Sequence, residues 1–265
     1  MLPGNLYSPA EPPNKFTPSL VFIVTVVTFV LLLLLGSYHQ RNVCDLVLVG
    51  WVLSTGLHEY AHALTAYIGG DRSILAKGYL DLNFLRYIDV TTSIVLPIMM
   101  IALGGIALPG AAVMIQSSDL PSAHWDALVS AAGPLGTLVS AVLFRVLMTL
   151  LKVLPESSSR VSAEALSFLV EIEFFSLLLN LLPLPPLDGW GIVSPYLSNS
   201  CGLKAYLDRS PWNRKTASLI TFFVVFVVFS LPPMFEAISS WANTLFLLNP
   251  LDVYRGHSRF LTPFD

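Results

Sequence analysis

Charge is scarce in this sequence. Only 12% of its 265 residues are charged, about half the share of a soluble domain, and 54% are hydrophobic. The 14 basic and 17 acidic residues give a net charge of −3. Because no basic block occurs, nucleic acid is not expected as a partner. The two cysteines, Cys44 and Cys201, lie far apart without metal-type spacing, so they indicate no redox compartment.

Long apolar runs take the place of charge. Residues 18–37 are uncharged over the ~20 positions that a helix needs to cross the hydrocarbon core. An integral, multi-pass membrane protein in contact with the lipid bilayer is therefore expected. The further predicted helical spans are 44–68, 126–152, 164–182 and 216–232, and the shorter 234–248, which either crosses or lies in the interface.

Residues 90–116 are apolar but broken. Pro97, Gly104, Gly105 and Pro109 interrupt a stretch long enough to cross once. Irregular backbone at membrane depth needs protein or water to satisfy its polar groups. The segment is therefore expected either to cross or to enter and leave on the same side.

One apolar helix carries three polar groups within five residues. His58, Glu59 and His62 fit the pattern H-E-x-x-H in the stretch WVLSTGLHEYAHALTAYIGG, residues 51–70. On a helix, positions i and i+4 share a face, so both imidazoles can reach one ion while the glutamate acts as a base. A chance match, with two hydrogen-bonded histidines, is the alternative. The cost of burying these groups in lipid favours a metal site.

A catalytic zinc site needs a third protein ligand. Glu171, Glu173 and Asp188 are the candidates. Asp188 follows a proline-rich stretch that cannot form a regular helix, and Gly189 permits a sharp turn after it. Asp188 can thus be aimed at a metal more freely than a carboxylate on a helix, although P-L-D-G is also typical of a surface turn.

Three motifs together resemble the site-2 protease family of intramembrane zinc metalloproteases. They are His58-Glu59-x-x-His62, Asn180-x-x-Pro183-x-Pro185-x-x-Asp188-Gly189 and, between them, Ala132-Gly133-Pro134-Leu135-Gly136-Thr137. The last is similar to the family's central helix, which contains a Gly-Pro pair. The resemblance covers about residues 44–195.

The resemblance implies a role for each matching residue. His58, His62 and Asp188 would hold one Zn²⁺ per chain, Glu59 would be the general base, and Asn180 would hold the substrate carbonyl or oxyanion. The structural positions would be Gly133, Pro134, Thr137, Pro183, Pro185 and Gly189. The family often has Asn where this chain has Thr137, which leaves the hydrogen-bonding role of that position open.

The family also places a small membrane-associated sheet between the first two core helices. Residues 72–82 and 104–116 are the counterparts here. By the resemblance, the second segment would bind an extended substrate through β-augmentation, at Gly104, Gly105, Pro109 and Gly110. A glycine-rich packing segment is the alternative. The order of spans in the family favours the re-entrant interpretation of residues 90–116.

The expected fold is an all-α polytopic membrane protein with about six transmembrane helices and a small β-sheet or re-entrant segment. The expected parts are a tail (1–17), a first transmembrane helix and loop (18–43), a catalytic core (44–195) and a C-terminal region (196–265). Arg145 is expected to pair with Glu171 or Glu173. The predicted loops on the N-terminal side hold more Lys and Arg, which favours a cytoplasmic N-terminus.

The expected function is zinc-dependent hydrolysis of peptide bonds in or near transmembrane segments. The partner would be a membrane-protein substrate with an unwound segment, and no oligomeric state is predicted. A bacterial-type inner membrane is expected, or else a plastid or other organelle membrane, with the site opening toward the cytoplasm. The alternative function is a non-proteolytic zinc-binding membrane protein, either a carrier or a catalytically silent scaffold.

Overall fold

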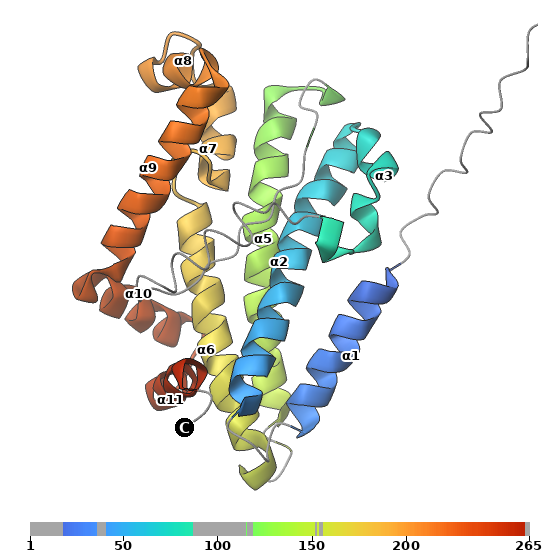
Figure 1. Cartoon of the computed structure of the whole chain (residues 1–265), viewed down its shortest axis with the longest axis vertical. Coiled ribbons are helices and arrows are strands. Elements are labelled where there is room, and N and C mark those ends of the chain that lie inside the picture. The colour runs from blue at the N-terminus through green and yellow to red at the C-terminus, as the bar shows by residue number, and fades with distance from the viewer. Residues whose placement is uncertain are drawn as a thin grey trace, which may run out of the picture.

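The computed structural model describes residues 18–35, 41–86, 115, 119–151, 153 and 156–262. Three long helices form its centre: α2 (Arg41–Gly69), α5 (Ala123–Leu151) and α6 (Glu156–Asn180). They run along the long axis of the molecule, with α1 (Leu20–Leu35) beside α2 (Figure 1). Every regular element within the described ranges is a helix, which confirms the expected helical class.

Helix α6 lies deepest in the bundle. Six consecutive residues, from Ala165 to Val170, are fully buried. A helix that is covered on all sides must be central, because one exposed face would leave a stripe of accessible side chains. The largest apolar cluster gathers around it and draws residues from α1, α2 and α5, including Phe29, Leu46 and Phe144.

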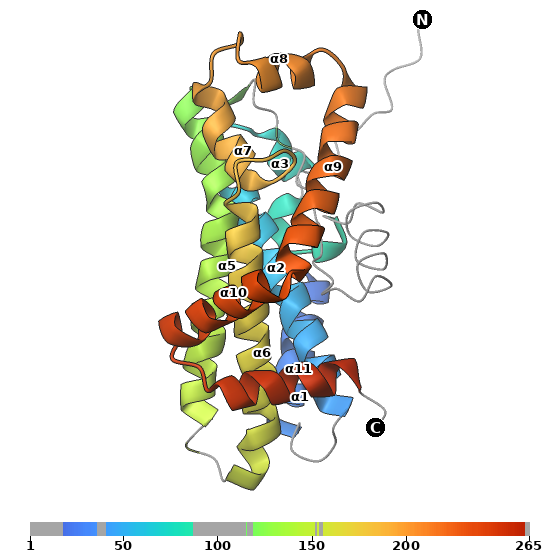
Figure 2. The same cartoon turned by 90° about the vertical axis from the view of Figure 1, so that its left-hand side faces the viewer.

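The C-terminal helices leave this parallel arrangement. Helix α8 (Gly202–Asp208) leads into α9 (Pro211–Ser230), which runs along the bundle. Helices α10 (Pro232–Leu245) and α11 (Pro250–Leu261) then lie across it (Figure 2). With 14 residues, α10 is shorter than the ~20 needed to span a membrane, and it runs across the bundle instead of along it.

Each predicted span coincides with a helix, but a helix at the predicted position does not by itself show that the chain crosses a membrane there. Among the described helices, two are long and apolar enough to cross a membrane, α5 and α9, and α1 is apolar but shorter. Helices α2 and α6 are long but carry buried polar side chains such as Glu59 and Glu164. The expected count of about six crossings is therefore not established by the helices themselves.

The expected strand at residues 72–82 is wrong. This stretch forms α3 (Ser73–Ala76) and the 3-10 turns η1 (Tyr79–Asp81) and η2 (Phe84–Arg86). Gly78 and Leu82 have φ angles of 67° and 54°, which lie in the left-handed region and not in the β region. The apolar positions are used to pack against α2, where Ile74 and Leu80 are buried. The other expected strand, 104–116, lies outside the described residues apart from position 115.

The expected ion pair of Arg145 is also wrong. Its Nε donates to the carbonyl of Phe246 at 2.5 Å, at the C-terminal end of α10. Unpaired carbonyls and the negative end of the helix dipole make that a favourable place for a cation. Glu171 instead accepts from Ser239, and Glu173 accepts from Ser54 at 2.5 Å.

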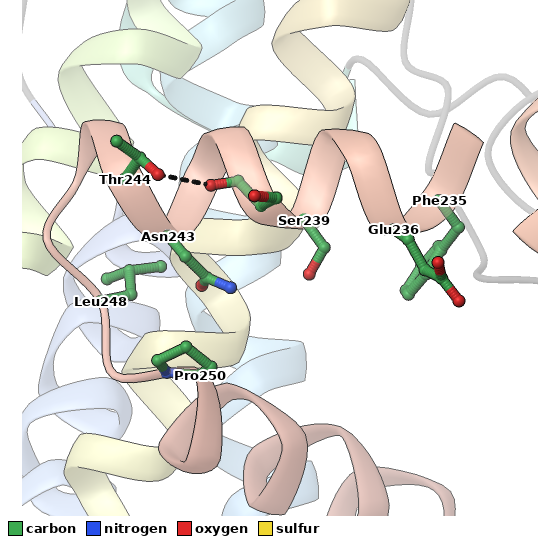
Figure 3. A pocket seen from close by; sticks show the side chains of 8 residues that line it. Phe235, Glu236, Ser239, Asn243, Thr244, Leu248 and Pro250 are labelled. Atoms are coloured by element: carbon green, nitrogen blue, oxygen red, sulfur yellow. Dashed lines mark hydrogen bonds between the residues drawn. The ribbon is translucent and has the colours of Figure 1, made fainter. Parts of the chain in front are cut away.

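A hollow of about 470 Å³ lies along α10. Figure 3 shows polar side chains of α10 on its wall, and Leu248 and Pro250 near the start of α11. The lining residues are Phe235, Glu236, Ser239, Ser240, Asn243, Thr244, Leu248 and Pro250. None of them is a predicted site residue, so this hollow is distinct from the candidate site.

Candidate active site

The site is built on the middle of α2. His58 and His62 are one turn apart and their rings meet edge to face, with centroids 4.8 Å apart. Glu59 and His62 are both buried, with 4% and 7% of their surface exposed. A helix of mostly apolar residues thus holds three polar side chains inside the protein, as the H-E-x-x-H spacing predicts.

Asp188 joins the two histidines from a distant part of the chain. Its Oδ2 lies 3.2 Å from His58 Nε2, and its Oδ1 lies 3.3 Å from His62 Nε2. The two Nε2 atoms are 3.1 Å apart. The three side chains therefore converge through their free ligand atoms, an arrangement that could hold a metal ion.

The other ring nitrogens are fixed by α5. His62 Nδ1 lies 2.7 Å from the carbonyl oxygen of Val129, to which it can only donate. His58 Nδ1 lies 2.9 Å from Thr137 Oγ1, which can accept its proton. This assignment leaves both Nε2 lone pairs directed at the cluster, which is how a protein orients metal-ligating histidines. The hydrogen-bonding position left open by the sequence is therefore filled by Thr137.

The donor set fits a zinc ion. Around a tetrahedral zinc with bonds of about 2.0–2.1 Å, neighbouring ligand atoms lie about 3.3 Å apart. The two Nε2 atoms, 3.1 Å apart, are close to this spacing, and each lies 3.2–3.3 Å from one oxygen of the Asp188 carboxylate, Oδ2 for His58 and Oδ1 for His62. Two lone pairs facing each other beside a carboxylate repel one another, and a cation removes that repulsion. Two imidazoles and one carboxylate also leave a fourth position open.

Helix α5 closes over the histidines because it carries glycine there. A Cβ on Gly133 would lie 2.1 Å from His62 Nε2 and 2.6 Å from His58 Nε2. One on Gly136 would lie 3.0 Å from the carbonyl oxygen of Leu57. Pro134 lacks an amide proton and its ring pushes on the preceding turn. The carbonyl four residues before Pro134 is that of Ser130, and the neighbouring carbonyl of Val129 is the one that binds His62.

A tight turn aims Asp188. It is the first residue of α7 (Asp188–Val193), which packs against α5 (Figure 1). A Cβ on Gly189 would lie 2.3 Å from the carbonyl oxygen of Leu182, so the chain can fold back here only with glycine. Gly191 approaches α5 in the same way, since its Cβ would lie 2.3 Å from Ser130 Oγ. Pro183 and Pro185 lie within the turn that separates α6 from α7.

The remaining candidates do not belong to the group of possible metal ligands or lie outside the described residues. Asn180 is the last residue of α6, eight positions before Asp188, and its role stays a prediction. Glu171 and Glu173 bind serines, which argues against either as the third ligand. The proposed substrate-binding residues, Gly104, Gly105, Pro109 and Gly110, lie outside the described residues.

Sequence reasoning missed two contributors. Gly191 was not singled out, although the spacing D-G-W-G places a second small residue where α7 meets α5. The Val129 carbonyl could not have been found, because a backbone acceptor has no residue-type signature.

Comparison with known proteins supplies an independent view. Over 196 residues the chain is 35% identical to the protein named "Putative zinc metalloprotease Rip2" of Mycobacterium tuberculosis strain H37Rv, covering 74% of this chain and 72% of that protein. The chain belongs to the site-2 protease family.

Other members of this family are similar over shorter or more diverged stretches. The Mycolicibacterium smegmatis protein of the same name is 42% identical over 153 residues, and the match spans 58% of each chain. "Putative zinc metalloprotease YwhC" of Bacillus subtilis is 28% identical over 72% of this chain. No family model and no solved structure matches the chain.

Proposed function

We propose that this protein is an intramembrane zinc endopeptidase that hydrolyses peptide bonds in or near transmembrane segments of membrane proteins. The observation that carries the proposal is the convergence of the ligand atoms of His58, His62 and Asp188, at separations of 3.1–3.3 Å, next to Glu59 on the same helix. Membership of the site-2 protease family and the printed names of the relatives support it.

Each residue of the cluster has a distinct task. His58, His62 and Asp188 would hold one zinc ion per chain. A bound zinc ion lowers the pKa of its water to near neutral and polarises the scissile carbonyl. Glu59 accepts a proton from the attacking water and delivers it to the leaving amine as the carbon–nitrogen bond breaks. Burial of Glu59 keeps bulk water from competing for that proton.

The substrate is a membrane protein whose cleaved segment is unwound. A helical segment hides its carbonyls in its own hydrogen bonds, so a protease must bind an extended strand. Residues 104–116 are the candidate edge for that strand, and Asn180 is the candidate donor to the substrate carbonyl. Residues 44–195 form the catalytic core because they contain every residue given a task above.

The proposed setting is the lipid bilayer. Family membership and the apolar helices α5 and α9 support it. The long helices α2 and α6 and the shorter α1 would cross beside them, since they pack along the same axis (Figure 1). The distribution of Lys and Arg favours a site that opens toward the cytoplasm, and the bacterial relatives favour a bacterial cell membrane.

The test separates metal binding from catalysis. Wild-type protein and Glu59→Gln are purified, loaded with zinc and reconstituted with a library of single-span membrane peptides. We expect both proteins to hold one zinc ion and only the wild type to produce new peptide ends by mass spectrometry. Cleavage by Glu59→Gln at the wild-type rate would refute the assigned base. Zinc flux into vesicles without cleavage by the wild type would support a carrier instead.

A further inference from the structure

A second group of charged residues gathers around Glu164 of α6, and none of them belongs to the group of possible metal ligands. Glu164 is fully buried, yet three arginines converge on its carboxylate. Arg259 Nη1 lies 2.7 Å from Oε2, Arg160 Nε lies 3.3 Å from Oε1, and Arg255 Nη1 lies 3.8 Å from Oε1. We refer to Arg160, Arg255 and Arg259 as the arginine cluster.

A glycine contact brings two of these arginines to α6. A Cβ on Gly256 would lie 2.2 Å from the carbonyl oxygen of Glu164 and 2.8 Å from Cβ of Phe168. Helix α11 therefore rests directly on the backbone of α6 at that point. Arg255 and Arg259 flank the contact on α11, while Arg160 reaches it from one turn earlier on α6.

The arginine cluster has more charge than Glu164 can neutralise. Three guanidinium groups face this one carboxylate, and two further acidic residues stand one turn away in the sequence, Asp252 before Arg255 and Glu156 before Arg160. Burial lowers the pKa of His257, so this neighbour adds no charge at neutral pH. The side chains of Arg160, Arg255 and Arg259 are 50%, 35% and 27% exposed, while Nη1 of Arg259 is buried, so Arg160 and Arg255 are the more accessible from outside.

The cluster lies where an apolar helix ends. Ser162, two residues before Glu164, donates to the carbonyl of Leu33 at 2.8 Å, in the last turn of α1. Helix α11 lies across the bundle at this level (Figure 2). It also presents exposed apolar side chains to the outside: Leu251, Tyr254 and Leu261. Exposed apolar groups beside cations on a crosswise helix are typical of an element in the membrane interface.

We propose that the arginine cluster binds the phosphate of an anionic lipid headgroup. Guanidinium groups bind phosphate oxygens in paired hydrogen bonds, and clusters of cations at the membrane surface recognise anionic lipids. Arg259 neutralises Glu164 and fixes α11 on α6, which leaves Arg160 and Arg255 to bind the lipid. The proposal rests on the membrane setting proposed above, but not on protease activity.

The test removes two of the three positive charges and keeps the ion pair between Arg259 and Glu164. The double variant Arg160→Gln/Arg255→Gln leaves Glu164 paired with Arg259. It is compared with wild type and with Arg209→Gln, an exposed arginine in the loop after α8. Each protein is held in nanodiscs of phosphatidylcholine, titrated with phosphatidylglycerol, and its bound lipid is counted by native mass spectrometry.

We expect phosphatidylglycerol to bind the double variant about 30-fold more weakly, since each cation near the surface contributes roughly fivefold. Arg209→Gln should bind as the wild type does. Glu164→Gln should bind more tightly than wild type, because it raises the excess charge. A purely structural role for the arginines predicts no gain in lipid binding for Glu164→Gln. Equal binding of phosphatidylglycerol by the wild type and the double variant would overturn the proposal.

Two further measurements distinguish a lipid phosphate from free phosphate, and lipid binding from proteolysis. Inorganic phosphate at the lipid concentration should not displace the bound lipid. Displacement would show a small-anion site and overturn the assignment to lipid. Glu59→Gln should bind phosphatidylglycerol as the wild type does, so loss of lipid binding and loss of proteolysis are separately observed.

Discussion

Gly133 is the residue whose replacement should affect the metal site most directly. In Gly133→Ala the new Cβ would lie 2.1 Å from His62 Nε2, whereas ordinary contacts begin at 3.4 Å. One side must therefore move by more than about 1 Å, although metal sites tolerate ligand displacements of only about 0.2 Å. Changes in groups that merely orient ligands cost 10–100-fold in metal affinity. We expect Gly133→Ala to weaken zinc binding by more than about 100-fold.

The same substitution should have a much smaller effect on the stability of the zinc-free protein. Overpacking costs about 1–3 kcal/mol, but Ala in place of Gly within a helix returns up to about 1 kcal/mol. The free energy of unfolding without zinc should thus fall by no more than about 2 kcal/mol. Zinc affinity is measured by competition with a chelator of known affinity, and stability by thermal unfolding in excess chelator.

A matched glycine provides the control. Gly202→Ala places a Cβ in α8 with nothing within 4 Å, so zinc affinity should stay at the wild-type value. Gly136→Ala should give an intermediate result, since its nearest contact, the Leu57 carbonyl, is at 3.0 Å. Wild-type zinc affinity in Gly133→Ala would refute the close packing of α5 on the two histidines.

Three further predictions concern the surroundings of the cluster. Thr137→Val should lower zinc affinity about 10–100-fold, because His58 Nδ1 loses its acceptor, and Thr137→Ser should keep the wild-type affinity, because serine supplies the acceptor again. A chelator titration measures both variants, and equal zinc affinities of Thr137→Val and Thr137→Ser would contradict this account. Gly191→Ala should displace Asp188 and lower zinc affinity, and adding Ser130→Gly should restore most of it by relieving the 2.3 Å contact; an unrescued double variant would contradict that account. Stripping zinc with a chelator should lower the unfolding temperature of the wild type, since a ligand that binds only the folded state stabilises it; in Asp188→Ala the chelator should cause a much smaller shift.

The sequence was most informative where the physical signal is local. Apolar runs predicted the long helices, because the requirement to satisfy backbone groups in lipid acts on each segment separately. The spacing of His58 and His62 predicted a shared helix face, because side chains at positions i and i+4 of a helix lie one above the other. Asp188 was ranked above Glu173 because a broken segment can be aimed, and the structure places its carboxylate beside both imidazoles.

Features that depend on distant contacts were predicted poorly. The family resemblance implied a strand at residues 72–82, but Gly78 and Leu82 take left-handed conformations and the apolar side chains pack on α2 instead. Arg145 was matched to a carboxylate at equal depth, although the end of α10 offers a backbone carbonyl. A sequence gives no direct sign of which free carbonyl comes near a given cation after folding.

Zinc X-ray absorption spectroscopy of the purified wild-type protein tests the central claim most directly. The account predicts one zinc ion per chain with nitrogen and oxygen ligands at about 2.0–2.1 Å, two of them imidazole. It also predicts that Asp188→Ala keeps both imidazoles and loses one oxygen from the protein. Sulfur at about 2.3 Å, or a first shell without imidazole, would contradict the assignment of His58, His62 and Asp188.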